Sequence, residues 1–177
     1  MQTDVKQMKK LVSAALCLAL CLVLPFLTAN NVALGNMLSL MHIPVLLCGL
    51  VCSWHYGLLV GFLAPLLRSF LLGAPPLMIA VPMAFELAVY GLVAGLLYPL
   101  FRSKKVGIYL ALVPALVAGR IAAAVVKFAM LGLGSLQAFT LNQFVQSYLV
   151  IQWPAILLQL TLIPLVVFAL QKAKLVE

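Results

Sequence analysis

The sequence predicts an all-α integral membrane protein: a bundle of six transmembrane helices with the N- and C-termini in the cytoplasm. Of the 177 residues, 66% are hydrophobic and 8% are charged, whereas soluble domains are roughly half apolar and a quarter charged. A bilayer core needs about 20 apolar residues for each spanning helix, so a chain of this length supplies about six spans with short loops. We therefore expect residues 1–177 to form a single membrane domain embedded in the lipid bilayer.

Six apolar runs define the expected helices, and no strand-like alternation interrupts them. The first run follows a lysine-rich start, as in a signal peptide, but it lacks a small-residue cleavage site and further spans follow it. It is therefore expected to be a retained helix. The six helices are expected at about residues 11–29, 43–54, 57–72, 77–98, 107–131 and 148–171.

The second run is too short to cross a bilayer by itself. It begins beside His42 and Pro44, and the preceding residues 32–41 are expected to enter the membrane as ordered, non-helical chain. Such chain is tolerated only where protein or a water-filled cavity covers it, so this segment indicates a cavity. The sixth run follows the longest loop, at residues 134–147.

The basic residues predict the orientation of the bundle. With six spans, eight of them fall on one side of the membrane, which the positive-inside rule assigns to the cytoplasm. No lysine or arginine remains for the outer loops, so the net charge of +8 is mainly a topology signal and does not indicate nucleic-acid binding. The eight residues are Lys6, Lys9, Lys10, Arg102, Lys104, Lys105, Lys172 and Lys174.

Four charged residues lie inside predicted helices: Arg68, Glu86, Arg120 and Lys127. Charges within a membrane are costly and usually face the bundle interior. At 1.5 Å per residue, Glu86 lies roughly 14 Å and Arg120 roughly 16 Å below the outer ends of their helices, so these two can pair. Arg68 and Lys127 lie about 6 Å from the outer ends.

Two interpretations of these charges stay open. In the first, Glu86 and Arg120 form a structural ion pair, while Arg68 and Lys127 extend to the outer lipid headgroups. In the second, the charges line a pocket that opens to the outside and carries uncompensated positive charge. Such a pocket suits a small molecule with a carboxylate or phosphate, and Glu86 would also hold Arg120 in place for it.

Several kinds of chemistry find no support in the sequence. Cys17 with Cys21 and Cys48 with Cys52 are spaced for packing on helix faces, since zinc sites usually use tighter spacing. The two histidines are predicted on opposite sides of the membrane and form no metal cluster. No nucleophile elbow and no phosphate-binding glycine loop is present. We expect no enzymatic activity, no metal, no cofactor and no ATP binding by this chain.

Two further stretches indicate contacts between helices or with a ligand. Ala15 and Ala19 form a small-xxx-small face, which lets helices approach closely in lipid. From spacing alone, this face favours packing inside the chain. In the sixth helix, Trp153 suits the membrane interface, while Gln152 and Gln159 need polar partners, and a polar ligand is one option.

These motifs together resemble the substrate-binding S components of energy-coupling-factor (ECF) vitamin transporters. The resemblance covers most of the chain and depends on the order and spacing of the motifs. One departure is Ala155, where glycine is expected after the proline. The motifs are AxxxA at 15–19, MHIPVLLCGL at 41–50, YGLLVGFLAPLLRSFLLGAPPL at 56–77, AFELAVYGLVAGLLY at 84–98, AGRI at 118–121 and WPAILLQLTLIP at 153–164.

The resemblance implies a substrate-capturing subunit in the plasma membrane of a bacterial cell. Its partners would be a transmembrane coupling subunit, docked on the face with Ala15 and Ala19, and two cytoplasmic ATPase subunits. The S component would topple in the membrane and carry its pocket inward. The loops at residues 30–42, 73–77 and 132–147 would close over the ligand.

The candidate pocket combines the charged residues with nearby polar and aromatic ones. In the family, Glu86 and Arg120 are expected to be scaffold, while Arg68 and Lys127 would read the substrate. An anionic vitamin such as pantothenate fits this charge count best, and a pyridoxine-type vitamin fits next. The candidates are Asn36, His42, Arg68, Glu86, Tyr90, Arg120, Lys127, Gln152 and Trp153.

Two other classes of function remain alternatives. A proton-coupled secondary transporter would use Glu86 as its proton carrier and would transport without ATPase partners. A structural or assembly subunit would bind no small molecule at all.

Overall fold

The computed structural model describes residues 2–28, 39–102, 106–134 and 152–173, and everything below concerns these residues. All their regular secondary structure is helical. Five helices are long and apolar enough to cross a membrane, and one is shorter. The helices are α1 (Gln2–Val23), which continues as the 3₁₀ helix η1 (Leu24–Thr28), α3 (His42–Val51), α4 (Trp54–Leu72), α5 (Leu77–Phe101), α6 (Gly107–Gly134) and α8 (Trp153–Lys172).

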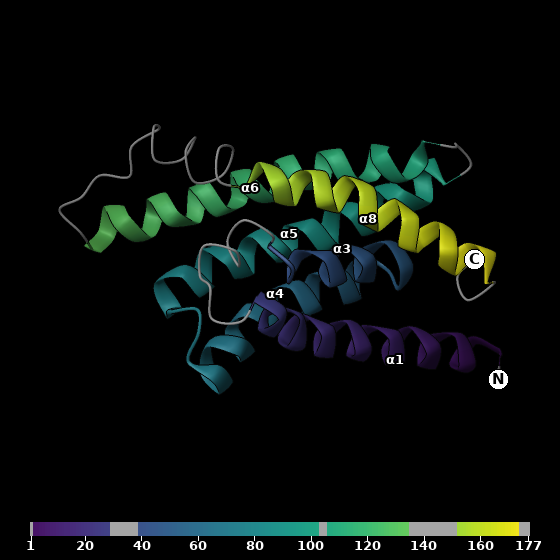
Figure 1. Ribbon diagram of the computed structural model, residues 1–177, viewed down its shortest axis with the longest axis horizontal. Coiled ribbons are helices and arrows are strands. Elements are labelled where there is room, and N and C mark those ends of the chain that lie inside the picture. Colours follow the sequence, from purple (N-terminus) through teal and green to yellow (C-terminus); the bar gives the residue numbers. More distant parts are fainter. Residues whose placement is uncertain (1, 29–38, 103–105, 135–151, 174–177) are drawn as a thin grey trace.

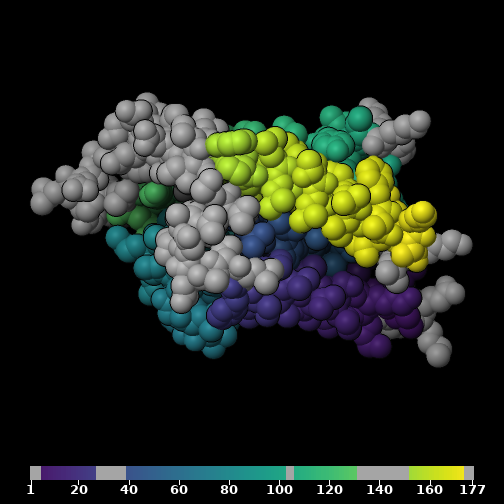
Figure 2. All heavy atoms as spheres, viewed as in Figure 1, coloured from purple at the N-terminus to yellow at the C-terminus, as the bar shows by residue number. Residues whose placement is uncertain are grey.

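The helices lie alongside one another, and the start of α1 and the end of α8 are at the same end of the molecule (Figure 1). α5 occupies the middle and packs against α3, α4 and α6. α1 covers α3 and α4, whereas α8 covers α3 and contacts α6. Figure 2 shows α3 in the groove between α1 and α8. The all-helical membrane fold is thus confirmed, while six full crossings stay a prediction because α3 has only 10 residues.

The N-terminal boundary differs most from its prediction. α1 begins at Gln2 and not near residue 11, because the polar start contains no proline or glycine and is rich in good helix formers. The α-helix ends at Val23, and the 3₁₀ turns of η1 contain Pro25, which lacks the N–H that an α-helix needs. The predicted non-helical segment at residues 32–41 lies mostly outside the described residues.

Three other boundaries also shift. The predicted second helix runs too far, because Ser53 has a φ of 147° and separates α3 from α4, which begins at Trp54. α5 continues through Pro99 to Phe101. α8 begins at Trp153, with Pro154 in its first turn, where its missing N–H costs no hydrogen bond. The predicted start at residues 148–151 lies outside the described residues.

Glycines bring α3, α4 and α5 into direct backbone contact. A Cβ atom on Gly91 of α5 would lie 2.2 Å from the carbonyl oxygen of Gly57 on α4. A Cβ on Gly49 of α3 would lie 2.5 Å from the carbonyl oxygen of Gly91. Small residues at such crossings allow the close packing that holds helices together in lipid. This seam fixes α5, and therefore the polar residues that it carries.

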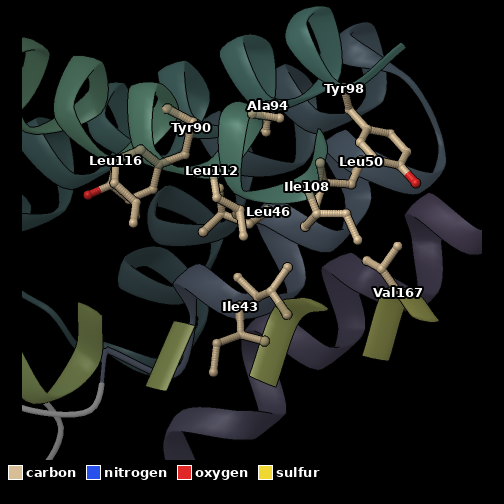
Figure 3. Close-up of a cluster of buried hydrophobic side chains, with 13 residues drawn as sticks. Ile43, Leu46, Leu50, Tyr90, Ala94, Tyr98, Ile108, Leu112, Leu116 and Val167 are labelled. Carbon is tan, nitrogen blue, oxygen red and sulfur yellow. The ribbon is translucent and has the colours of Figure 1, made fainter. Parts of the chain in front are cut away.

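Two apolar clusters flank α3. The first joins α3, α5, α6 and α8 (Figure 3), and the second joins α1, α3, α4 and α5. Three of the four free cysteines are buried members of the second cluster, in agreement with the packing role predicted for them. The first cluster consists of Ile43, Leu46, Leu50, Tyr90, Ala94, Tyr98, Ile108, Ala111, Leu112, Ala115, Leu116, Ile163 and Val167.

Candidate functional site

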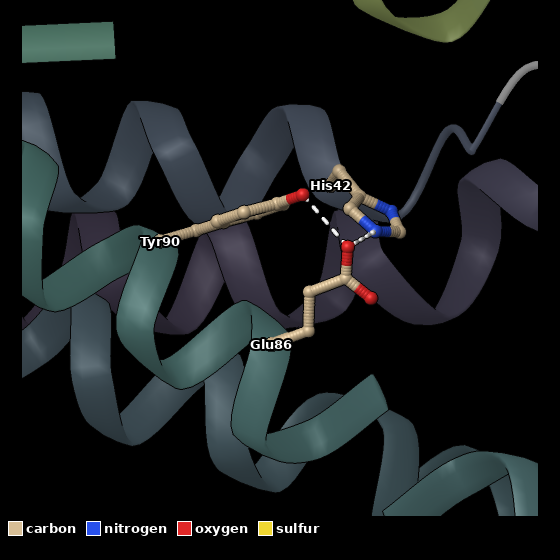
Figure 4. A network of polar contacts seen from close by, with 3 residues as sticks. All are labelled: His42, Glu86 and Tyr90. Atoms are coloured by element: carbon tan, nitrogen blue, oxygen red, sulfur yellow. Dashed lines mark hydrogen bonds and ion pairs between the residues drawn. The ribbon is translucent and has the colours of Figure 1, made fainter. Parts of the chain in front are cut away.

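A buried polar network joins α3 to α5 (Figure 4). The Tyr90 hydroxyl donates a hydrogen bond of 2.7 Å to Glu86 Oε1, and His42 Nε2 lies 3.8 Å from the same oxygen. The rings of His42 and Tyr90 have centroids 5.5 Å apart. Each of these three residues is at most 4% exposed. The structure therefore brings three predicted site residues together inside an apolar bundle.

Local structure explains how these side chains meet. Glu86 and Tyr90 are four residues apart on α5, so they share one helix face. His42 is the first residue of α3, and a turn positions it, since its backbone N–H donates to the Ser39 carbonyl at 3.0 Å. The glycine seam holds α3 and α5 close enough for the histidine to reach the carboxylate.

The consecutive residues Gly119 and Arg120 of α6 complete the surroundings of Tyr90. A Cβ atom on Gly119 would lie 2.1 Å from Tyr90 Cδ1, so the ring occupies the space that the glycine leaves open. Arg120, which is 8% exposed, lies close enough to the Tyr90 hydroxyl for its charge to act on it. Glu86 and Arg120, predicted at one depth, thus both reach the same tyrosine.

Arg68 has different surroundings, at the end of α4. Its Nε donates to the Ala74 carbonyl and its Nη1 to the Leu22 carbonyl, both at 3.1 Å. Its guanidinium lies 5.4 Å from the centre of the Phe26 ring. Arg68 therefore ties the end of α1 to the turn after α4. These partners are neutral, so the local charge of the arginine is retained.

The remaining predicted residues are more peripheral or lie outside the described part. Lys127 is half-buried on α6, and Gln152 is half-buried just before α8. Trp153 is 56% exposed, as suits an aromatic side chain at a membrane interface. Asn36 lies outside the described residues.

Ala15 and Ala19, the predicted partner-binding residues, are both exposed on α1. They lie on the side of the helix that turns away from α3 and α4, whereas Ala14 and Cys21 face the bundle. Their small-xxx-small face is therefore not used for packing within the described residues. It remains open to another chain or to lipid.

Gln159 is a buried polar residue that was not among the predicted pocket residues. Gln159 of α8 is 1% exposed, and both polar atoms of its amide lack a hydrogen-bond partner. Neither ring nitrogen of His42 makes a hydrogen bond, and Gln152 Oε1 also lacks one. The only sequence signal for Gln159 was a glutamine within an apolar run, which did not reveal the direction of its side chain.

The described residues contain no group of three or more histidine, cysteine or acidic side chains arranged to hold a metal ion. The site instead offers hydrogen-bond donors and acceptors and one buried carboxylate, near an arginine. This arrangement can hold a small polar molecule, and it includes no activated nucleophile among the described residues.

A comparison with protein families identifies the family of the chain. The family model for the substrate-specific component of ECF transporters matches residues 9–175. Searches of curated proteins and of solved structures found no match. Since the family model spans nearly the whole chain, this protein belongs to the family of substrate-specific components of ECF transporters.

Proposed function

We propose that this chain captures a small water-soluble vitamin or precursor from outside the cell and delivers it inward as part of an ATP-driven transporter. The observation that carries the proposal is the buried polar network of His42, Glu86 and Tyr90. Polar groups inside a membrane bundle are costly and commonly mark a binding site or pathway. The hydrogen-bonding capacity that His42 leaves unused is then available to the substrate.

We propose an anionic, pantothenate-like substrate, with a pyridoxine-type vitamin as the next choice. Away from the lysine-rich start of α1 and the end of α8, the membrane helices carry three cations and one acid: Arg68, Arg120, Lys127 and Glu86. Arg68 is supported by neutral carbonyl groups, so its charge can attract an anion. Arg120 lies beside Tyr90, near the centre of the network. Such fixed positive charges would select a carboxylate or phosphate.

The proposed partners are a transmembrane coupling subunit and two cytoplasmic ATPase subunits. The exposed face with Ala15 and Ala19 supports a docking role for α1. The start of α1 and the end of α8 lie at one end of the molecule (Figure 1), together with lysine-rich sequence. The positive-inside rule favours this end as the cytoplasmic one, in a bacterial plasma membrane.

Uptake into proteoliposomes tests the proposal. The chain alone should bind vitamin without transporting it, and turnover should require the coupling subunit, the ATPases and ATP. The alternative is a proton-coupled transporter, which the burial of Glu86 beside His42 and Tyr90 favours, because such groups can carry protons. Uptake by the chain alone, driven by a pH gradient and lost in Glu86→Gln, would contradict the proposed function.

A further inference from the structure

α8 presents the polar side chain of Gln159 to the interior of the bundle. Its buried residues include Ala155, Gln159, Ile163 and Val167, each four residues from the next, so they form a single stripe. Ile163 and Val167 belong to the apolar cluster with Ile43 and Tyr90. Gln159 continues the same stripe one turn earlier, so its amide faces the bundle and not the lipid.

A hydrogen bond fixes the depth of this amide relative to α5. Gln171 Nε2 donates to the Tyr98 hydroxyl at 2.7 Å. α5 and α8 run in the same direction (Figure 1), and both Glu86 and Gln159 lie twelve residues before these partners. At 1.5 Å per residue, both lie roughly 18 Å from the Tyr98–Gln171 contact. Gln159 is therefore at the depth of the buried network.

The buried amide of Gln159 lowers the stability of the fold. It is 1% exposed, and neither its oxygen nor its nitrogen has a hydrogen-bond partner. A buried polar group without a partner destabilises a protein. His42, on the α3 helix that α8 covers, also has a ring nitrogen, Nδ1, without a hydrogen bond. Two helices thus direct unused hydrogen-bonding groups into the same interior.

We propose that Gln159, with His42, recognises an uncharged amide-type group of the substrate, an inference that depends on the proposed function. A carboxamide presents an acceptor oxygen and a donor nitrogen side by side. Its complement on one edge is a primary amide, a lactam, a cyclic imide or a ureide. An open-chain secondary amide is trans, so its N–H and C=O point to opposite sides; Gln159 would then bind one of these groups and His42 the other. A carboxylate, an ether or a lone hydroxyl would leave part of the amide unsatisfied. The substrate class is therefore a vitamin with an amide-type group, which favours pantothenate over pyridoxine.

The test measures binding and stability in Gln159→Leu and Gln159→Met, which have similar volumes. The probes are pantothenate and biotin, which carry amide-type groups, and pyridoxine and lipoate, which do not. We expect the wild-type protein to bind an amide-bearing probe and both variants to bind it about 10- to 100-fold more weakly. Without any probe, the melting temperature should rise by about 2–4 °C, because an unpaired buried amide is removed.

Thr161→Val is the matched control on α8. The Thr161 hydroxyl is exposed and donates only to carbonyls of its own helix, at 2.8 and 3.1 Å. This variant should bind the same probe as tightly as the wild-type protein. Weaker binding by the control to the same extent as by the Gln159 variants would contradict a specific role for the amide.

The inference and the proposed function fail in different ways. If pyridoxine or lipoate binds in preference, or if an amide-bearing probe binds the Gln159 variants as tightly as the wild-type protein, the inference is wrong and the proposed function stands. A fall in ligand-free stability in both variants would make the glutamine structural and would also overturn the inference. If no water-soluble vitamin, the four probes included, binds the wild-type protein or is taken up by the complete transporter, both are wrong.

Discussion

The middle of the bundle and the C-terminal end of α4 each contain an arginine, but the surroundings of the two differ. Arg120 is buried beside Tyr90 and Glu86, within contacts that join α5 and α6. Arg68 is half-buried and holds two backbone carbonyls from the end of α1 and the turn after α4. In sequence, both are simply cations in apolar helices.

This difference separates two energetic roles. A buried charge without an opposite charge nearby strongly destabilises the folded protein. Residues of the middle region should therefore control stability as well as binding. An arginine at the end of a helix keeps access to water and headgroups, so its loss costs less. Substitutions in the two regions should therefore affect stability by different amounts, even when both weaken substrate binding.

Glu86→Gln should have the largest effect. It removes the negative charge from a residue that is 4% exposed, near Arg120 and His42. We expect a loss of about 3 kcal/mol of stability without substrate, since a buried charge loses its compensation. Thermal unfolding of the ligand-free protein measures it. Unchanged stability combined with lost binding would make Glu86 a ligand contact and not a structural partner.

Gly119→Ala should have the next largest effect. The added Cβ would lie 2.1 Å from Tyr90 Cδ1, so the ring would have to move away from α6. Overpacking of this kind costs about 1–3 kcal/mol. Ala123→Gly, at another buried position of α6, is the control for a change of one methyl group. Substrate affinity should also fall in Gly119→Ala, because Tyr90 orients Glu86. If Gly119→Ala kept the stability and affinity of the wild-type protein, the Tyr90 ring could move without cost and the prediction would be wrong.

Tyr90→Phe should have a smaller effect. The substitution keeps the ring in the apolar cluster but removes the hydroxyl that donates a hydrogen bond of 2.7 Å to Glu86 Oε1. The loss of this hydrogen bond should cost about 1–2 kcal/mol, because the carboxylate loses one of its donors. Thermal unfolding and substrate titration of Tyr90→Phe and of Tyr98→Phe distinguish the roles of the two hydroxyls, since the Tyr98 hydroxyl accepts a hydrogen bond from Gln171 outside the network. Equal losses of substrate affinity in both would contradict a special role for Tyr90.

Arg68→Gln should have the smallest effect on stability, about 1 kcal/mol, because its hydrogen bonds to two carbonyls are partly open to solvent. Binding of pantothenate should nevertheless weaken, and Arg68→Lys should restore part of the affinity because it keeps the charge. Titration at low and high salt measures this electrostatic part. A loss of stability as large as that of Glu86→Gln would remove the distinction between the two regions.

Much of the fold could be predicted because lipid imposes length and hydropathy on each helix. The helix ends were less predictable. The start of α1 is helical although it is polar and outside the apolar run, and Ser53 separates α3 from α4 through its backbone conformation, which composition does not reveal. Spacing alone favoured Ala15 and Ala19 as internal packing, yet both are exposed.

Part of the site could be predicted from the depth of each residue along its helix, because residues at the same depth on adjacent helices can meet. Glu86 and Arg120 were expected at one level, and both reach Tyr90. The hydrogen bond from Arg68 to the Leu22 carbonyl could not be predicted, since it joins α4 to α1 across 46 positions of sequence. Gln159 was expected to need a polar partner but was not placed in the pocket, because the rotation of α8 about its own axis decides whether its amide faces lipid or protein.

The most direct test of the substrate-binding role is to purify the protein, denature it and analyse the released small molecules by mass spectrometry. A vitamin or precursor should be released from the wild-type protein in near-stoichiometric amount, and much less from Arg120→Met, provided that this variant is recovered folded. Arg68→Gln should release an intermediate amount. No small molecule from properly folded wild-type protein would contradict the account and favour a structural or assembly subunit.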